Sequence, residues 1–287
     1  MLAGVELGGT KCVCVLGTGP EDIVAQKKIP TTTPTETLLA IREILSTWDH
    51  DAIGFASFGP LNLDRASPGY GHIVNTTKPG WDGADIVSLA DGRPYGFDTD
   101  VNGAALAEGR WGAAHELRSW VYVTVGTGVG VGSIVNGRPI EGLGHSEAGH
   151  MRVPRRPGDD FAGICPFHGD CVEGLASGPA IAARTGRPAA ALAADDPAWA
   201  LVADTLAALC HNLVLTSLPQ RILMGGGVVM GQPHLLPMVR ERLVTSLGSY
   251  GAVNLAENYL AQPALGSRAG PLGAIALAQD ALIRSVN

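Results

Sequence analysis

The chain has 287 residues, more than one average hydrophobic core covers, so its length predicts two domains. Hydrophobic residues make up 46% of it and charged residues 16%, which is ordinary for a folded globular protein and excludes a disordered one. The formal net charge of −7 argues against a nucleic-acid-binding protein, which needs a basic surface.

Export and membrane signals are not expected in this sequence. No apolar run approaches the roughly 20 residues that a membrane helix requires. The N-terminal segment has no basic region, and Glu6 interrupts its apolar stretch, so it does not resemble a secretion signal. Five cysteines, an odd number, predict reduced or metal-bound thiols rather than a disulfide framework. We therefore expect a cytoplasmic protein.

The first part of the chain is predicted to open with two strands. Residues 2–7 and 12–17 are apolar runs separated by Gly8-Gly9-Thr10, the pattern of a strand pair with a tight turn. A helix, a strand, an extended loop region and a second helix are then predicted at residues 36–48, 52–57, 60–80 and 101–112.

The second part repeats this opening. Residues 120–126 and 129–135 are apolar runs around Gly126-Thr127-Gly128. A long apolar helix is predicted next, followed by a short strand that leads into Gly225-Gly226-Gly227, and by a final alanine-rich helix; these are residues 198–217, 221–224 and 269–285. The repetition indicates a duplicated α/β domain with a cleft between the two copies.

The two glycine turns are candidate phosphate-binding loops. Turns of this composition expose backbone N–H groups, and the missing side chains let a phosphate approach them. Gly8-Gly9-Thr10-Lys11 and Gly126-Thr127-Gly128 head the two halves, and Gly225-Gly226-Gly227 is a third place where backbone can lie against a ligand. The alternative for a single such turn is an ordinary hairpin turn, because hairpin turns are rich in glycine.

Asp100 lies between a predicted strand and a predicted helix. One interpretation makes it the N-cap of that helix, a common role for aspartate. The other makes it a general base that points into the cleft. The sequence leaves both open.

A metal site is predicted from residue 150 to residue 171. Cys165, His168 and Cys171 are spaced at i, i+3 and i+6, and His150 upstream supplies a fourth ligand. Two cysteinates and two imidazoles suit a closed tetrahedral zinc site. The other cysteines lie in apolar patterns and are predicted to be core residues: Cys12, Cys14 and Cys210.

Glu147 and Glu173 bracket this segment. Carboxylates beside an ordered loop are good acceptors for vicinal sugar hydroxyls. Each of them alone would be interpreted as a solvated surface acid.

Together these segments resemble the ROK family of bacterial sugar kinases and sugar-responsive repressors. The resemblance runs in order from residue 4 to about residue 280. It covers the two phosphate loops, the catalytic segment, the Glu-x-Gly-His motif and the adenosine-side glycines, which here are Glu6–Lys11, Thr124–Gly130, Asp100–Glu108, Glu147–His150 and Gly225–Gly227.

The resemblance implies a two-domain α/β fold of the actin-like ATPase (ribonuclease H-like) type, with ATP in the interdomain cleft. We expect an N-terminal domain of residues 1–112, joined by the C-terminal helix of residues 272–287, and a C-terminal domain of residues 113–271 that carries the zinc loop.

The resemblance also implies the roles of individual residues in an ATP-dependent kinase that uses Mg²⁺ and structural Zn²⁺. Asp100 would be the general base. The sugar would bind Asn102, Glu147, His150 and Glu173. The nucleotide phosphates would bind Gly8, Gly9, Thr10, Lys11, Gly126, Thr127, Gly128, Gly225, Gly226 and Gly227. Zinc would bind His150, Cys165, His168 and Cys171. A sugar and ATP are the expected partners, with a homodimer and neither nucleic acid nor membrane.

Three departures from the family pattern resemble its fructokinase branch. Family members usually carry Asp in place of Glu6, and many glucokinases carry Asn in place of Thr99. The zinc segment is Cys-Pro-Phe-His-Gly-Asp-Cys in place of the usual Cys-x-Cys-Gly-x-x-Gly-Cys. We therefore expect a fructokinase that makes fructose 6-phosphate.

The alternatives within the kinase class are a glucokinase, a mannokinase or a broad-specificity hexokinase. From another class, a sugar-sensing repressor is disfavoured, because such relatives carry a helix-turn-helix before the first phosphate loop and here the first strand is predicted at about residue 2.

Overall fold

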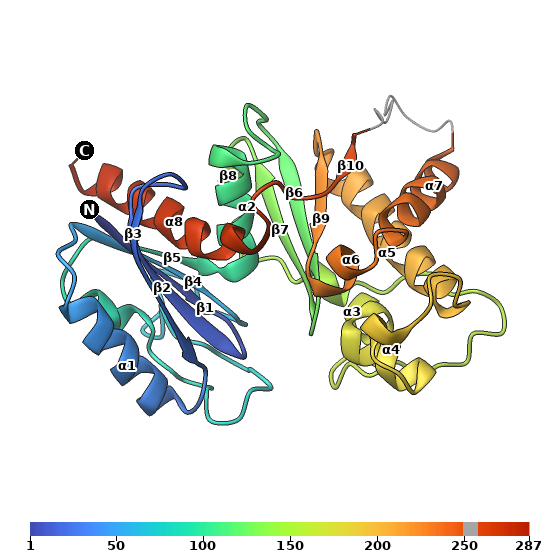
Figure 1. Cartoon of the computed structure of the whole chain (residues 1–287), viewed down its shortest axis with the longest axis horizontal. Coiled ribbons are helices and arrows are strands. Elements are labelled where there is room, and N and C mark those ends of the chain that lie inside the picture. The colour runs from blue at the N-terminus through green and yellow to red at the C-terminus, as the bar shows by residue number, and fades with distance from the viewer. Residues whose placement is uncertain (249–257, 287) are drawn as a thin grey trace. The chain divides into compact units, whose positions relative to one another are not determined.

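The structure, a computed structural model, describes residues 1–248 and 258–286 and divides the chain into two compact units (Figure 1). Unit 1 comprises Met1–Glu116, Arg138–His145 and the chain from Ala264 onward. Unit 2 comprises Leu117–Gly137 and Ser146–Pro263. The predicted division joined residues 1–112 and 272–287 in one domain and placed residues 113–271 in the other. Because Arg138–His145 belongs to unit 1, the chain passes between the units more often than that division implies.

Unit 1 is built on a mixed sheet in the order β3-β2-β1-β4-β5. Strands β1, β2 and β3 are antiparallel neighbours, whereas β1, β4 and β5 run parallel. The strands are Leu2–Leu7, Lys11–Gly17, Ile23–Pro30, Ala52–Ser57 and Tyr95–Thr99. The helices of the unit are α1 (Pro34–Ser46), η1 (Val87–Ala90), α2 (Asp100–Trp111), η4 (Gly266–Arg268) and α8 (Ala269–Val286), and β8 is Arg138–Pro139.

Helices cover both faces of this sheet. On one face Ile41 and Leu45 of α1 join a core with Val5 and Leu7 of β1. On the other face α8 packs against β1, β4 and β5, where Ile275 is fully buried. Gly54 permits this contact, because a Cβ at that position would overlap the backbone of α8. The last helix of the chain thus completes the unit that the first strands begin.

Unit 2 contains a sheet whose strands follow the order β10-β9-β6-β7. Its strands are β6 (Trp120–Val125), β7 (Val129–Val135), β9 (Ile222–Gly225) and β10 (Leu260–Ala261). Its helices are η2 (Ala148–His150), α3 (Val172–Ala176), α4 (Gly178–Thr185), η3 (Ala189–Ala191), α5 (Ala198–Ser217), α6 (Gly227–Gly231) and α7 (Leu235–Leu247). Helices α5 and α7 pack together and supply much of the apolar core around β6 and β9.

Helix α5 corrects one expectation drawn from the sequence. Among the described residues it alone has the length and hydropathy of a membrane-crossing helix, although no run of that length was expected. Its buried side chains, among them Trp199 and Leu206, belong to the core of unit 2. A buried core helix passes the same test of length and composition, so α5 is weak evidence for a membrane.

The cysteines predicted to be core residues are fully buried: Cys12, Cys14 and Cys210.

Candidate active site

The first glycine turn joins β1 to β2 and is held by side chains from elsewhere in unit 1. Within the turn, Gly8 N donates to Lys11 O at 3.1 Å. The Thr31 hydroxyl donates to Gly8 O at 2.7 Å, and Lys78 Nζ donates to Gly9 O at 2.7 Å. The carbonyl oxygens of Gly8, Gly9 and Lys11 therefore already accept hydrogen bonds. The backbone groups of the turn that are not bonded in this way remain available to a ligand.

Glu6 lies near the end of β1, beside this turn. Its carboxylate packs on α8 so closely that a Cβ at Gly270 would overlap it. Burial raises the pKa of Glu6, and the charges of Lys11 and Lys28 lower it in part. Unit 1 thus places an acidic group next to the turn.

Asp100 is the first residue of α2, and its neighbour Thr99 caps the helix. Thr99 has extended backbone geometry, and its Oγ1 accepts a hydrogen bond from Asn102 N at 3.1 Å. Asp100 Oδ1 accepts from Val101 N at 2.8 Å. The interpretation of Asp100 as the N-cap is therefore wrong, because Thr99 has the non-helical dihedrals and the hydrogen bond that define a cap.

Asp98 orients Asn102 at the edge of a cavity. Asp98 Oδ1 accepts from Thr99 N at 2.7 Å and from Asn102 Nδ2 at 2.8 Å, and burial raises its pKa. The cavity has a volume of about 440 Å³ and is lined in unit 1 by Asp98 and Asn102, by the 63–65 and 140–144 segments, and by two aromatic rings. This volume lies in the range of small-molecule sites, about 300–1,000 Å³.

The second glycine turn joins β6 to β7 in unit 2. Gly126 N donates to Gly128 O at 2.9 Å, and Gly178 N donates to Gly126 O at 2.7 Å. Directly after the turn, Val129 N donates to Glu173 Oε2 at 3.0 Å. The start of α4 and the carboxylate of α3 thus hold the two ends of this turn.

The third glycine segment lies beside the second turn. Strands β6 and β9 pair in parallel with Thr124 opposite Gly225. Gly226 has φ of 88°, and a Cβ there would lie 2.5 Å from Val125 N, so only glycine fits. A Cβ at Gly126 would lie 3.9 Å from Gly227 N, which places the two glycine segments of unit 2 together.

The four predicted metal ligands converge in unit 2. One ligand atom from each of His150, Cys165, His168 and Cys171 lies within 4.8 Å of all the others. His150 Nδ1 lies 3.6 Å from Cys165 Sγ and 3.5 Å from Cys171 Sγ, and His168 Nδ1 lies 3.6 Å from Cys165 Sγ. Zinc bonds of about 2.3 Å to sulfur and 2.0 Å to nitrogen at a tetrahedral angle separate the two atoms by about 3.5 Å. The cluster therefore has the dimensions of a tetrahedral zinc site.

Two carboxylates adjoin the cluster. Burial raises the pKa of Glu147, while the charge of His150 lowers it and that of Glu173 raises it. Glu173 lies on α3, whose N-cap is Cys171, and Cys171 Sγ accepts from Gly174 N at 3.4 Å. A predicted metal ligand thus begins the short helix that carries Glu173.

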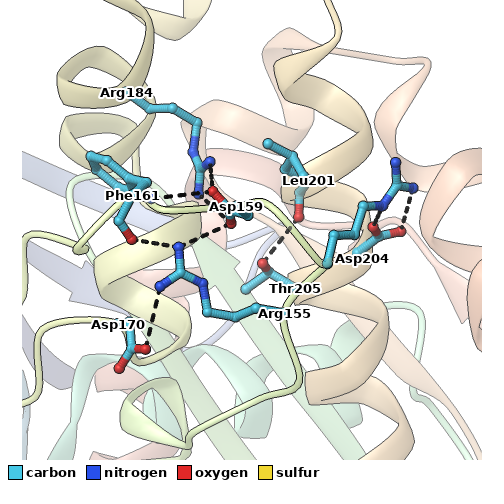
Figure 2. Close-up of polar contacts among 9 residues, drawn as sticks. Arg155, Asp159, Phe161, Asp170, Arg184, Leu201, Asp204 and Thr205 are labelled. Carbon is cyan, nitrogen blue, oxygen red and sulfur yellow. Dashed lines mark hydrogen bonds and ion pairs between the residues drawn. The ribbon is translucent and has the colours of Figure 1, made fainter.

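Arginine–aspartate pairs hold the rest of the predicted metal loop, residues 150–171 (Figure 2). Asp159 accepts from Arg184 Nη1 at 2.5 Å and pairs with Arg155 at 3.2 Å. Arg184 also lies over the Phe161 ring at 4.5 Å. The hydrogen bonds from Arg184 hold the pKa of Asp159 at about 2, well below its ordinary value. These pairs tie the loop to α4 without using the metal cluster.

Sequence reasoning missed Thr31, Lys78 and Asp98. Nothing in the local pattern around Thr31 or Lys78 indicates that either reaches a turn formed by residues 8–11. Asp98 lies two residues before Asp100 and four before Asn102. Because it lies at the end of a strand that runs into a helix, that spacing could have indicated a contact with Asn102.

The sequence model of the ROK family matches residues 2–281. This chain belongs to the ROK family. A protein named fructokinase from Pediococcus pentosaceus is 41% identical over 98% of this chain and 99% of its own length. Another fructokinase, from Zymomonas mobilis, is 43% identical over 96% of this chain and 95% of its own length.

A solved ROK hexokinase from Thermus thermophilus superposes with a TM-score of 0.79 at 26% identity, covering 100% of this chain and 99% of that one. The two-domain actin-like fold predicted from the sequence is therefore confirmed.

Proposed function

We propose that this ROK protein is an ATP-dependent fructokinase that converts D-fructose and ATP to D-fructose 6-phosphate and ADP. The observation that carries the proposal is that relatives named fructokinase are 38% to 43% identical over nearly the whole chain. Among the further matches, a kanosamine kinase and two glucokinases are 26% to 30% identical. The same comparison favours fructose over glucose.

Asp100 is the proposed general base. It lies in the first turn of α2, and its carboxylate would accept the proton of the primary sugar hydroxyl as that oxygen attacks phosphorus. Phosphoryl transfer has a loose transition state, so the protein contributes mainly position and charge rather than covalent chemistry. One positioned carboxylate is enough for this role.

The glycine turns are the proposed phosphate and nucleotide sites. Gly8, Gly9, Thr10 and Lys11 supply exposed backbone and a cation in unit 1. Gly126, Thr127 and Gly128 adjoin the third segment, Gly225, Gly226 and Gly227, in unit 2. Mg²⁺, when bound with ATP, neutralises phosphate charge, and Glu6 is the acidic side chain next to the first turn that would contact its water shell.

The sugar ligands are proposed to be Asn102, Glu147, His150 and Glu173. Asp98 holds the amide nitrogen of Asn102, which leaves the amide oxygen for a hydroxyl group. His150 directs Nδ1 at the two cysteines, so its Nε2 is the nitrogen that can reach a hydroxyl. Glu173 uses Oε2 on Val129 N and keeps Oε1 for the sugar. Asn102, His150 and Glu173 therefore each have one polar atom anchored and another to offer.

Zn²⁺ is the proposed occupant of the cluster of His150, Cys165, His168 and Cys171. Two cysteines and two histidines at tetrahedral separation give a closed site, and zinc bound there supplies structural cross-linking rather than activation of water. We further propose that the protein acts in the cytoplasm as a homodimer, without a nucleic-acid or membrane partner.

A coupled ADP-release assay with fructose, glucose, mannose and N-acetylmannosamine tests the function. The expected result is the highest kcat/KM with fructose, and phosphorus NMR of the product should show a phosphate on the 6-hydroxyl group. A higher kcat/KM with glucose or mannose would assign the chain to the alternative kinases. Turnover of none of the four sugars would overturn the proposal.

A further inference from the structure

Lys78 brings a cation to the first glycine turn from a distant part of the chain. Its Nζ donates to Gly9 O at 2.7 Å, across a sequence separation of 69 residues. Gly9 is exposed, and a Cβ there would meet no atom within 4 Å, so the space above the turn is open. The ammonium group therefore lies at the rim of the proposed phosphate site.

The backbone that carries Lys78 is fixed. Asn75 N donates to Asp82 Oδ1 at 2.6 Å, and Lys78 N donates to Thr76 Oγ1 at 3.2 Å. The fully buried ring of Trp81 donates through Nε1 to Thr32 O at 2.9 Å. Since Thr32 follows the strand that pairs with β2, the loop and the turn are anchored to one sheet. These hydrogen bonds thus hold the backbone of Lys78 near the first turn.

The charge of Lys78 has no acidic partner among the residues that the structure describes. Within the described ranges 1–248 and 258–286, no carboxylate forms an ion pair with it. An ammonium group has three N–H donors, and Gly9 O accepts one of them. A fixed cation with free donors, beside open backbone, is suited to an anionic oxygen.

We propose that Lys78 is a phosphate-binding residue that contacts the terminal phosphoryl group of ATP during transfer. The inference rests on the proposed kinase function. As the bond from the terminal phosphorus to ADP breaks and the bond to the sugar oxygen forms, the sugar proton goes to Asp100. The Lys78 ammonium group offsets negative charge on the equatorial oxygens of the transferred group, over which a loose transition state spreads it.

The test compares Lys78→Met, which removes the charge at similar length, with Lys78→Arg, which keeps it. Lys27→Met, at an exposed lysine of β3, is the matched control. We expect kcat with fructose to fall about 100-fold in Lys78→Met, in the range for loss of one preorganised donor. Lys78→Arg should recover at least a tenth of wild-type kcat, and Lys27→Met should leave kcat unchanged.

Calorimetry separates the terminal phosphate from the rest of the nucleotide. In Lys78→Met the affinity for AMPPNP should fall about 10-fold more than the affinity for ADP, because one donor to the terminal group is missing. Wild-type kcat in a Lys78→Met protein with an unchanged melting temperature would overturn the proposal, as would equal losses for the two nucleotides. If Lys78→Met does not fold, Lys78→Gln replaces it in both measurements. AMPPNP binding needs no turnover. The binding result therefore tests the role of Lys78 even if the protein does not phosphorylate fructose.

Discussion

The two glycine turns have similar sequences, but side chains of different charge hold them in place. In unit 1 the carbonyls of the turn accept from a hydroxyl and an ammonium group, those of Thr31 and Lys78. In unit 2 a backbone N–H beside the turn donates to the Glu173 carboxylate, and Gly178 N donates to Gly126 O. One turn carries a cation at its rim, and the other is supported by an acid.

The groups that hold the two turns also belong to different parts of the molecule. The first turn is tied to the sheet of unit 1 through Thr31 and the Trp81 loop. The second is tied through Glu173 to α3, and α3 begins at a proposed zinc ligand, Cys171. We therefore expect substitutions at the charged groups of unit 1 to lower the rate of phosphoryl transfer. Substitutions in the predicted metal loop of unit 2 should instead lower ligand affinity and stability.

The largest effect expected is on turnover in unit 1. Asp100→Asn removes the proposed base and should lower kcat about 10²–10⁴-fold, the usual range for general-base loss. Because Thr99 and not Asp100 caps α2, the melting temperature and ADP affinity should change little. Asp49→Asn, at an exposed position of the same unit, is the control. Turnover within a few-fold of wild type would remove Asp100 from the mechanism.

Loss of the metal is the sharpest test of unit 2. Cys171→Ser, or chelation verified by elemental analysis, should raise the fructose KM about 10-fold, because Cys171 begins the helix that carries Glu173 and one lost hydrogen bond to a charged group costs about 1.5 kcal/mol. The melting temperature should fall, and ADP affinity should weaken as well, because Glu173 holds Val129 next to the second turn. Cys210→Ser, whose thiol is not in the cluster, is the control for the sugar and ADP affinities. Unchanged sugar and ADP affinities in zinc-free protein would separate the metal from both sites.

Unit 1 has a buried anchor that needs no metal. The fully buried Glu108 carboxylate accepts from Ala113 N at 2.7 Å, Ala264 N at 3.1 Å and Leu265 N at 2.8 Å. Glu108→Gln points an amide N–H₂ group at these donors and should lower the free energy of unfolding by about 2 kcal/mol, measured with urea. Glu43→Gln on the surface of α1 should have no such effect. Equal stability of the two variants would show that the three hydrogen bonds contribute little.

The smallest effect expected is on stability at acid pH, through Asp159 in the predicted metal loop. The pKa of Asp159 is about 2 in the folded protein against an ordinary 3.8, so the folded state favours the charged form. Its contribution to stability is complete above pH 3.8 and is lost as pH falls through about 2. The melting temperature should therefore drop less steeply over this window in Asp159→Asn than in Asp195→Asn, whose aspartate is exposed. Parallel curves would exclude Asp159 as a source of the acid sensitivity.

Local patterns in the sequence were enough for several elements of the fold. Apolar runs around Gly-Gly-Thr and Gly-Thr-Gly predicted both strand pairs, because a strand and its tight turn are specified within about 15 residues. The expected helix after Asp100 begins there. Strand β3 was missed because it is an exposed edge strand with Lys27 and Lys28 at its centre. Helix α7 was missed although Leu236, Val239 and Leu243 have helical spacing.

The sequence by itself determined the family and the compact motifs, including the spacing of Cys165, His168 and Cys171, since these depend on neighbours along the chain. Only the tertiary structure decided which groups surround them. Lys78 reaches Gly9 across 69 residues, and Glu173 reaches Val129 across 44. Such contacts form where the sheet and its covering helices pack, and packing is a property of the whole chain rather than of a local pattern. For the same reason the two turns look alike in sequence and differ in chemistry.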